Sequence, residues 1–441
     1  MTQRHDARAA RAHLGGETRR TVLPGGLRVI SESVPGSATF SLGFFVDTGS
    51  RHEQGELHGA AHFLEHVLFK GTRRRTAEEI SIAIESVGGD INAYTGKEQT
   101  CFYAKVLAED AELAVDVIAD MLSDSLISST DVEAERAVIL DEIAMHNDDP
   151  SDVAHELISR RLFGDGGLGL PVIGTQGSIA AMTAEQVTGY FHHHYGPASI
   201  VVSAAGRVDH DRLSASLASF RAGDPTPTGP TPSGTIGQPA DRDVDGPALL
   251  LSSRPLEQVT AVLGLPGVGL FDLRRHSLGL LSIILGGGMS SRLFVQVRER
   301  RGLTYGIEAG ETCYSDDGLW IVEWQSHSGR VGDILDLVRA ELADVVEHGV
   351  SDAELVRAKG QLRGQTLLAY EGPSARMSRL GSAELTGDSR TVAELLRASD
   401  EVTSADCQAV AVELFTADPV LALVGPDLGR TARRQVDAWI G

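Results

Sequence analysis

One order of predicted strands and helices occurs twice along this chain, and the second copy begins about 220 residues after the first. Two strands and one helix recur in the same order: 38–46 with 258–265, 100–106 with 318–324, and a helix start at Thr130 with one at Ser351. Three matches in one order predict an internal duplication. Each half is therefore expected to be an α+β unit in which helices cover a sheet.

A stretch without hydrophobic periodicity divides the two copies. Residues 221–247 are rich in Pro, Gly and Thr, which is typical of an extended linker. We therefore expect a first domain at 21–220 and a second, homologous domain at 248–441. Residues 1–20 are rich in Arg and have no apolar core, so we expect a flexible N-terminal tail there.

Composition excludes several classes of protein. The 441 residues carry a net charge of −22, which argues against binding to nucleic acid or to an anionic membrane surface. The three cysteines form no CxxC pair, so we expect neither a disulfide framework nor a cysteine-type zinc site. No run of about 18 apolar residues is present. Together these features favour a cytoplasmic protein in a reducing compartment.

The segment GAAHFLEHVLF contains the most informative motif, H-x-x-E-H. On the helix expected at 58–70, His62 and His66 are four residues apart and point from successive turns of one face. Two imidazoles in this arrangement can bind one tetrahedral metal ion. Glu65 lies beside them, where a carboxylate can act as the general base of metal-assisted hydrolysis. An amphipathic helix with incidental surface histidines is the structural alternative.

A third protein ligand is expected on the helix at 131–143. Glu135 and Glu142 are seven residues apart and share one face of this helix. One of the two can ligate the metal while the other supports the site from behind. The remaining acidic residues of this helix, Asp131, Glu133 and Asp141, are interpreted as a solvated face.

Together these segments resemble the inverted-motif zinc peptidases of the pitrilysin and insulinase family, especially its short members that are similar to processing peptidases. HFLEH and the later ERAVILDEI match that family's zinc signature. The resemblance implies that His62, His66 and Glu142 bind one zinc ion per chain. It also implies that Glu65 is the general base and Glu135 the supporting carboxylate.

The sequence NAYT, residues 92–95, also resembles the family's edge strand. In the family such an edge strand pairs with an extended peptide by β-augmentation. Asn92 and Ala93 are therefore expected to contact substrate. The alternative for Asn92 is a strand residue whose side chain bonds to its own local backbone.

In the second half, a glycine-rich loop and an Arg/Tyr pair resemble those of the family. The loop contains Gly286, Gly287 and Gly288, and the pair is Arg298 and Tyr305. A guanidinium and a phenol suit substrate carbonyls and a tetrahedral oxyanion, so the resemblance assigns both residues to catalysis. Without it, Arg298 would be read as a solvated helix residue and Tyr305 as the start of a strand. The second half carries no zinc motif of its own.

By this resemblance the chain is a zinc-dependent endopeptidase or oligopeptidase that cleaves extended peptides in a closed chamber. Long family members hold four such units, so this chain is expected to be half a clamshell that forms a homodimer. Arg298 and Tyr305 would then face the zinc ion of the partner chain. The alternatives are a catalytically silent scaffold or partner subunit, as in the cores of respiratory complexes, and a structural zinc site.

The negative charge has two interpretations. It can simply keep the protein soluble, or it can attract basic peptides, including presequence-like ones. The acidic residues concentrate around the expected third ligand, against the single Arg136, which favours the second interpretation. They are Asp131, Glu133, Glu135, Asp141, Glu142, Asp148, Asp149 and Asp152.

Overall fold

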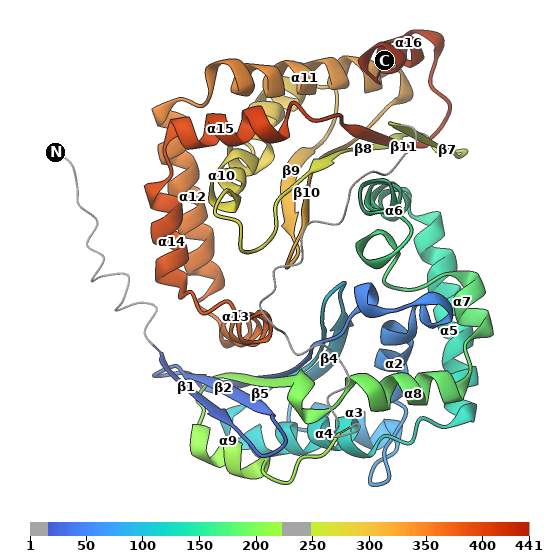
Figure 1. The fold of residues 1–441 in the computed structure, drawn as a ribbon, viewed down its shortest axis with the longest axis vertical. Coiled ribbons are helices and arrows are strands. Elements are labelled where there is room, and N and C mark those ends of the chain that lie inside the picture. The colour runs from blue at the N-terminus through green and yellow to red at the C-terminus, as the bar shows by residue number, and fades with distance from the viewer. Residues whose placement is uncertain (1–15, 223–247, 441) are drawn as a thin grey trace, which may run out of the picture. The chain divides into compact units, whose positions relative to one another are not determined.

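The computed structural model describes residues 16–222 and 248–440, which form two compact units, each with one β-sheet (Figure 1). The described residues of the first unit are 16–143, 171–222 and 367–393. Those of the second unit are 144–170, 248–366 and 394–440. The expected α+β class with two sheet-containing units is confirmed.

The first sheet has six strands in the order β1-β2-β6-β3-β5-β4. β2 and β6 pair in parallel, and the other neighbours are antiparallel. β3 is apolar and buried along most of its length, whereas exposed and half-buried residues alternate along β4, the edge strand. The bounds are β1 Glu17–Val22, β2 Arg28–Ser33, β3 Thr39–Val46, β4 Asp90–Thr95, β5 Thr100–Leu107 and β6 Ile200–Gly206.

The second sheet has five strands in the order β7-β11-β8-β10-β9. Its parallel pair is β7 and β11, which corresponds to β2 and β6, and the remaining strands correspond to β3, β5 and β4 in turn. This shared order confirms the internal duplication, with β1 as an additional strand of the first sheet. The bounds are β7 Leu249–Ser253, β8 Val259–Pro266, β9 Ile307–Cys313, β10 Gly318–Ser326 and β11 Val420–Gly425.

Each unit combines its sheet with helices around one large apolar core. In the first unit these helices are α2 Ala60–Leu68, α3 Ala77–Glu85, α4 Ala111–Asp124, α5 Ser129–Asp148, α7 Gln176–Ala181, α8 Ala184–His194 and α9 His210–Ser216. In the second they are α10 Arg275–Gly286, α11 Val331–His348, α12 Asp352–Ala369, α14 Val392–Glu401, α15 Ser404–Leu414 and α16 Arg430–Ile440. Among the described helices, none combines the length and apolar character needed to cross a membrane.

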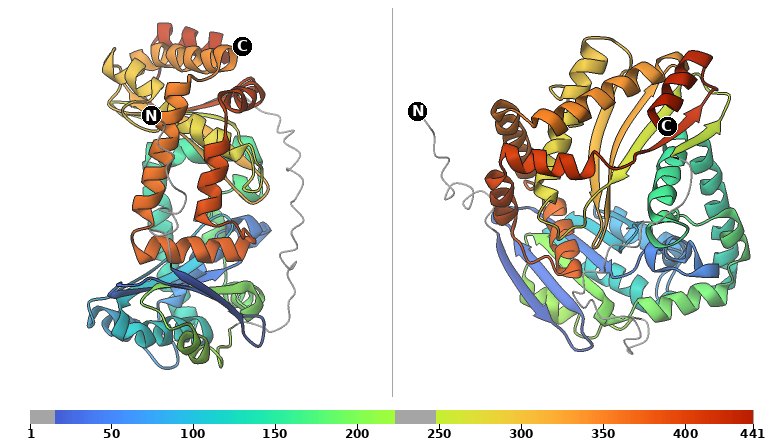
Figure 2. Two further views of the ribbon diagram at one scale, coloured as in Figure 1. Left: turned by 90° about the vertical axis from the view of Figure 1, so that its left-hand side faces the viewer. Right: turned by 45° about the horizontal axis from the view of Figure 1, so that its top comes forward.

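Two helices are exchanged between the halves of the sequence. α6 (Pro150–Phe163) packs on β8 and β11, and α13 (Pro373–Thr386) packs on β2, β3 and β6, as Figures 1 and 2 show. A glycine of the underlying strand, Gly43 in β3 and Gly264 in β8, lies beneath each helix. A Cβ on Gly43 would lie 2.5 Å from Met377 Sδ, and one on Gly264 would lie 2.5 Å from Ile158 Cγ2. The absence of a side chain at both glycines lets Met377 and Ile158 pack closely against the strands.

The exchange and the start of the first sheet differ from the boundaries expected from sequence. Boundaries of the compact units along the sequence fall within α5, α12 and α14, and not only near the linker, because α6 and α13 each cover the sheet built by the other half. The expected tail is too long, since residues 17–20 pair with β2 as part of β1. The structure describes only residues 221–222 of the expected linker 221–247. Residues 1–15 of the expected tail lie outside the described residues.

Candidate metal centre

The start of α2 is held by a glycine and a buried carboxylate. Gly59 caps the helix with a φ of 93°, and a Cβ there would lie 2.7 Å from Ile179 Cδ1. Glu53 accepts hydrogen bonds from the backbone N–H groups of Gly59 and Ala61, each at 2.7 Å. Two of the N–H groups at the helix start are thereby satisfied, which fixes where α2 begins.

Burial dominates the electrostatics of Glu53. It raises the pKa of this carboxyl from 4.5 to about 7, although the two backbone N–H groups and Lys97 oppose the change. The charged form of Glu53 is therefore costly in the folded protein, and its hydrogen bonds offset part of that cost.

α2 divides its residues between the core and the candidate centre. Its apolar side chains are buried in the first unit: Ala60, Ala61, Phe63, Leu64, Val67 and Leu68. His62, Glu65 and His66 are only partly buried. The two imidazole rings lie 4.7 Å apart between their centres, as the four-residue spacing predicts.

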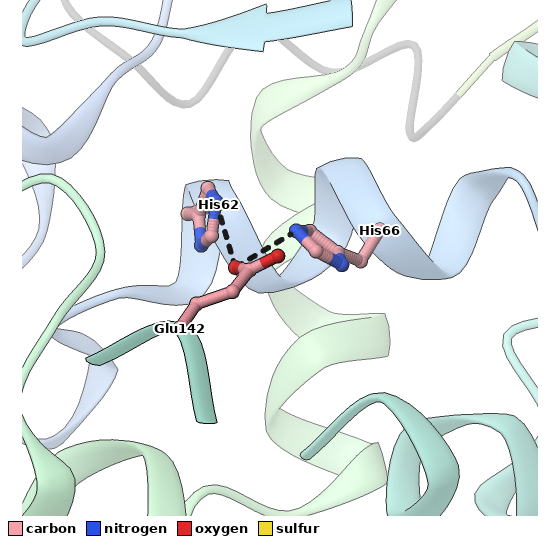
Figure 3. A group of neighbouring side chains, drawn as sticks. All are labelled: His62, His66 and Glu142. Carbon is pink, nitrogen blue, oxygen red and sulfur yellow. Dashed lines mark ion pairs between the residues drawn. The ribbon is translucent and has the colours of Figure 1, made fainter. Parts of the chain in front are cut away.

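Glu142 of α5 points toward both imidazoles (Figure 3). Its Oε2 lies 3.8 Å from His62 Nε2 and 3.5 Å from His66 Nε2. One potential ligand atom from each of the three side chains lies within 4.8 Å of the other two. Ligand atoms of a tetrahedral zinc ion at about 2.1 Å are about 3.4 Å apart, so this donor set fits zinc.

Glu135 lies behind His66 instead of facing both imidazoles. This carboxylate is only 4% exposed, and its Oε2 lies 3.0 Å from His66 Nδ1. Its Oε1 lies 2.5 Å from Lys70 Nζ, so the ammonium compensates the buried negative charge. A proton on Nδ1 directed at Glu135 leaves the Nε2 lone pair of His66 for a metal. The geometry thus separates the two glutamates that the sequence left as alternatives.

Glu65 is bonded to a residue of the neighbouring edge strand. Thr95 Oγ1, at the end of β4, donates a hydrogen bond of 2.5 Å to Glu65 Oε2. Burial raises the pKa of Glu65, and nearby Glu142 adds to the effect, while Thr95 and His66 act in the opposite direction. Thr95, Lys70 and Glu53 were not among the site residues expected from the sequence. A signal existed only for Thr95, which ends the NAYT segment already expected beside the site.

Known proteins match this chain over nearly all of its length. The family described as insulinase (peptidase family M16) matches residues 28–176, and the peptidase M16 inactive domain matches residues 181–362. An uncharacterized zinc protease of Streptomyces coelicolor is 43% identical over 96% of this chain and 93% of its own length. The chain belongs to peptidase family M16. This is the pitrilysin and insulinase family that the sequence motifs resemble.

Other relatives agree with this membership. An uncharacterized zinc protease, YmxG, of Bacillus subtilis is 33% identical over 92% of this chain and 98% of its own. Two crystal structures share the fold, each with a TM-score of 0.84. One is a peptidase M16 inactive domain from Pseudomonas fluorescens, 21% identical over 94% of this chain and 99% of that chain. The other is a protease from Helicobacter pylori, 18% identical over 93% of this chain and 100% of that chain.

In this M16 chain, Asn92 and Ala93 lie on β4, the edge of the first sheet. Asn92 Oδ1 accepts a hydrogen bond of 2.8 Å from the backbone N–H of Ala93, which is the local bond anticipated as its alternative role. Among the described strands only β5 pairs with β4, so the other side of β4 offers backbone groups to a further strand. A contact of either residue with substrate stays a prediction.

The three glycines of the second unit have structural reasons to be glycine. A Cβ on Gly286 would lie 2.2 Å from the backbone nitrogen of Ala309, so the end of α10 packs directly on β9. A Cβ on Gly287 would lie 2.6 Å from Ile283 Cα, and Gly288 has a φ of 151°. These contacts explain the three residues by packing and backbone conformation, and a substrate role for them stays a prediction.

Arg298 and Tyr305 of this M16 chain come together beside a cavity of about 800 Å³ in the second unit. Arg298 lies on a π-helical segment, Phe294–Glu299, with its guanidinium carbon 4.8 Å from the centre of the Phe294 ring and an ion pair to Glu299. Tyr305 is 91% exposed. Its phenol is therefore available for a ligand, as the predicted role requires.

Proposed function

We propose that this chain is a catalytically active peptidase that holds one zinc ion with His62, His66 and Glu142. The observation that carries the proposal is the convergence of these three donors with Glu65 on the adjoining turn of α2. A zinc ion at this place supplies Lewis-acid chemistry, which activates water and polarises a peptide carbonyl. Three protein ligands leave the fourth position that such chemistry needs.

The proton transfers belong to Glu65. Its carboxylate accepts a proton from the attacking water and later delivers it to the departing amine. Thr95 holds the carboxylate through the 2.5 Å hydrogen bond, and burial raises the pKa of Glu65, which makes its carboxylate a stronger base for the first transfer. Glu135 orients His66 from behind through Nδ1.

The proposed substrates are extended peptides. A peptide strand can pair with the free edge of β4, where Asn92 and Ala93 lie, and this is support from geometry for β-augmentation. Arg298 and Tyr305 are proposed to contact carbonyl oxygens and the oxyanion. Exposed acidic residues of α5, among them Glu133 and Asp141, favour basic peptides. Faster cleavage of cationic than anionic peptides, lost at high salt, would agree with this preference.

We further propose a homodimer in which two chains enclose the substrate and each supplies Arg298 and Tyr305 to its partner's zinc site. The support is that one chain carries both the metal-binding motif and the Arg/Tyr pair, so two identical chains suffice for two complete sites. A silent scaffold or partner subunit is the other candidate function. The retention of Glu65, with Thr95 bonded to it, favours catalysis, because a scaffold does not need a general base.

The proposed function is tested by the change Glu65→Gln in a quenched-fluorescence peptide assay. Glutamine keeps the size of the side chain but cannot take up the proton, so hydrolysis should fall by about 100-fold or more while bound zinc is unchanged. Glu78→Gln, on the exposed side of α3, is the matched control and should retain full activity. Equal hydrolysis by Glu65→Gln would remove this residue from the base role. Zinc-loaded wild type that cleaves no peptide would favour the scaffold.

A further inference from the structure

The cavity beside Arg298 and Tyr305 has positively charged walls, although the chain as a whole is acidic. It lies entirely within the second unit, between the segment 298–305 and the residues that follow β10. Arg298 and Arg330 line it, and Glu299 is its one acidic lining residue. In a chain of net charge −22, this is a local reversal of sign.

The net positive charge of the cavity comes from Arg330, because the charge of Arg298 is compensated. Glu299 is already in an ion pair with Arg298. Arg330 Nη1 donates to the backbone carbonyls of Gly302 and Leu303, at 2.7 and 3.5 Å, and these carbonyl oxygens carry no full charge. Within the described part of the chain, no carboxylate forms an ion pair with Arg330. Its positive charge thus remains for a ligand.

The other polar groups of the cavity add hydrogen-bond donors. His327 Nδ1 accepts the backbone N–H of Gly329 at 3.3 Å, so the proton of a neutral imidazole resides on Nε2, which can donate. Tyr305 adds a phenol. Thr304, in contrast, directs its hydroxyl to the carbonyls of Gly306 and Gln325 and away from any ligand. A cavity with a guanidinium and convergent donors suits a carboxylate, which accepts several charge-assisted bonds.

We infer that this cavity is a carboxylate-binding subsite for the peptide substrate and that Arg330 supplies its selecting charge. The inference rests on the proposed peptidase function, because Arg298 and Tyr305 on the same wall are the residues proposed to contact that peptide. The carboxylate is either the free C-terminus of the peptide or an Asp or Glu side chain. Both have the same chemistry, and Arg330 acts here in substrate selection and not in bond cleavage.

Binding measured without hydrolysis tests the inference. The full chain carrying Glu65→Gln would be titrated, by fluorescence anisotropy, with four labelled peptides that share one extended body. One pair differs in a C-terminal acid or amide, and the other, amidated, pair differs in one internal Glu or Gln. In one of the two pairs, we expect the peptide with the carboxylate to bind about tenfold more tightly than its neutral counterpart. The pair that shows this preference tells whether the cavity binds the C-terminal carboxylate or an acidic side chain.

The same titrations on Arg330 variants assign the charge. Arg330→Gln should remove the tenfold preference and leave the affinity for neutral peptides unchanged, whereas Arg330→Lys should retain part of it. Arg300→Gln is the matched control, since Arg300 bonds to Gln296 and does not line the cavity. Equal binding of acid and neutral peptides in both pairs would overturn the inference. So would a preference that survives in Arg330→Gln. Neither result depends on hydrolysis, so the proposed function is judged separately.

Discussion

At the scale of single residues, the account depends on how Glu65 is held. Its carboxylate lies next to His66 in sequence and accepts the hydroxyl of Thr95 from another element. A general base must keep one orientation toward the proton it accepts, and a single charge-assisted hydrogen bond can supply that restraint. Thr95 is in this view a positioning residue, because it acts through Glu65 and not on the substrate.

Replacing Thr95 by valine tests this role. Valine keeps the shape of the side chain but removes the donor, so kcat should fall by about tenfold, with KM little changed. Bound zinc, measured in the same samples, should stay at the wild-type level. Thr95→Ser keeps the hydroxyl and should recover most of the loss. Equal kcat values for the valine variant and wild type would show that Glu65 needs no such support.

Residue spacing explains which parts of the centre could be predicted. His62, Glu65 and His66 lie on one helix, and Glu135 and Glu142 on another, so helical periodicity alone gives their relative directions. Thr95 and Lys70 reach the site through contacts with Glu65 and Glu135. The NAYT segment pointed to Thr95 only through the family resemblance, and nothing in the sequence pointed to Lys70. Spacing alone left the choice between Glu142 and Glu135 open. The family resemblance assigned Glu142 to the ligand position, and the two helices in place supply the geometric reason.

At the scale of elements, the first turn of α2 couples the site to the buried Glu53. This carboxyl bonds to Gly59 and Ala61, and burial raises its pKa to about 7. Because the folded protein holds this proton more tightly than the unfolded chain, stability from this group is present at low pH. That stability is lost as pH rises through about 7.

The change Glu53→Gln tests whether the raised pKa of Glu53 makes stability depend on pH. As pH rises from the ordinary pKa of a glutamate to the raised pKa of Glu53, the free energy of unfolding of wild type should fall relative to that of the variant. The fall should be up to about 1.4 kcal/mol per pH unit. Urea unfolding at about pH 5 and about pH 8 measures the difference, since other titrating groups are common to both proteins. Parallel pH profiles for the two proteins would contradict the raised pKa.

The exchanged helices show what local patterns leave open. The apolar side of α6 contains Ala154, Ile158 and Leu162, and such a pattern indicates a helix and its buried face. It does not indicate which of two homologous sheets receives that face. The repeat predicts that the two halves share one order of strands. It does not predict which sheet α6 and α13 pack on, because contacts between residues distant in sequence decide this.

At the scale of the whole molecule, the proposed dimer predicts complementation between two inactive variants. Glu65→Gln removes the base, and Tyr305→Phe removes the phenol proposed to serve the partner's site. A mixed dimer then contains one doubly altered site and one intact site. Co-expression of the two variants should restore about one quarter of wild-type activity when chains pair at random.

Gel filtration of the same samples must show dimers for this prediction to hold. A mixture no more active than its two separate variants would place Tyr305 with the zinc site of its own chain. A wild-type monomer with full activity would exclude the shared site altogether.

The central claim is that His62, His66 and Glu142 together hold one zinc ion, and metal content per chain tests it most directly. Elemental analysis after equilibration at limiting free zinc should give about one zinc per wild-type chain and little in Glu142→Gln. Asp141→Asn, one residue away on the exposed side of α5, should match wild type. Wild type without zinc, or Glu142→Gln with wild-type zinc content and affinity, would contradict the account.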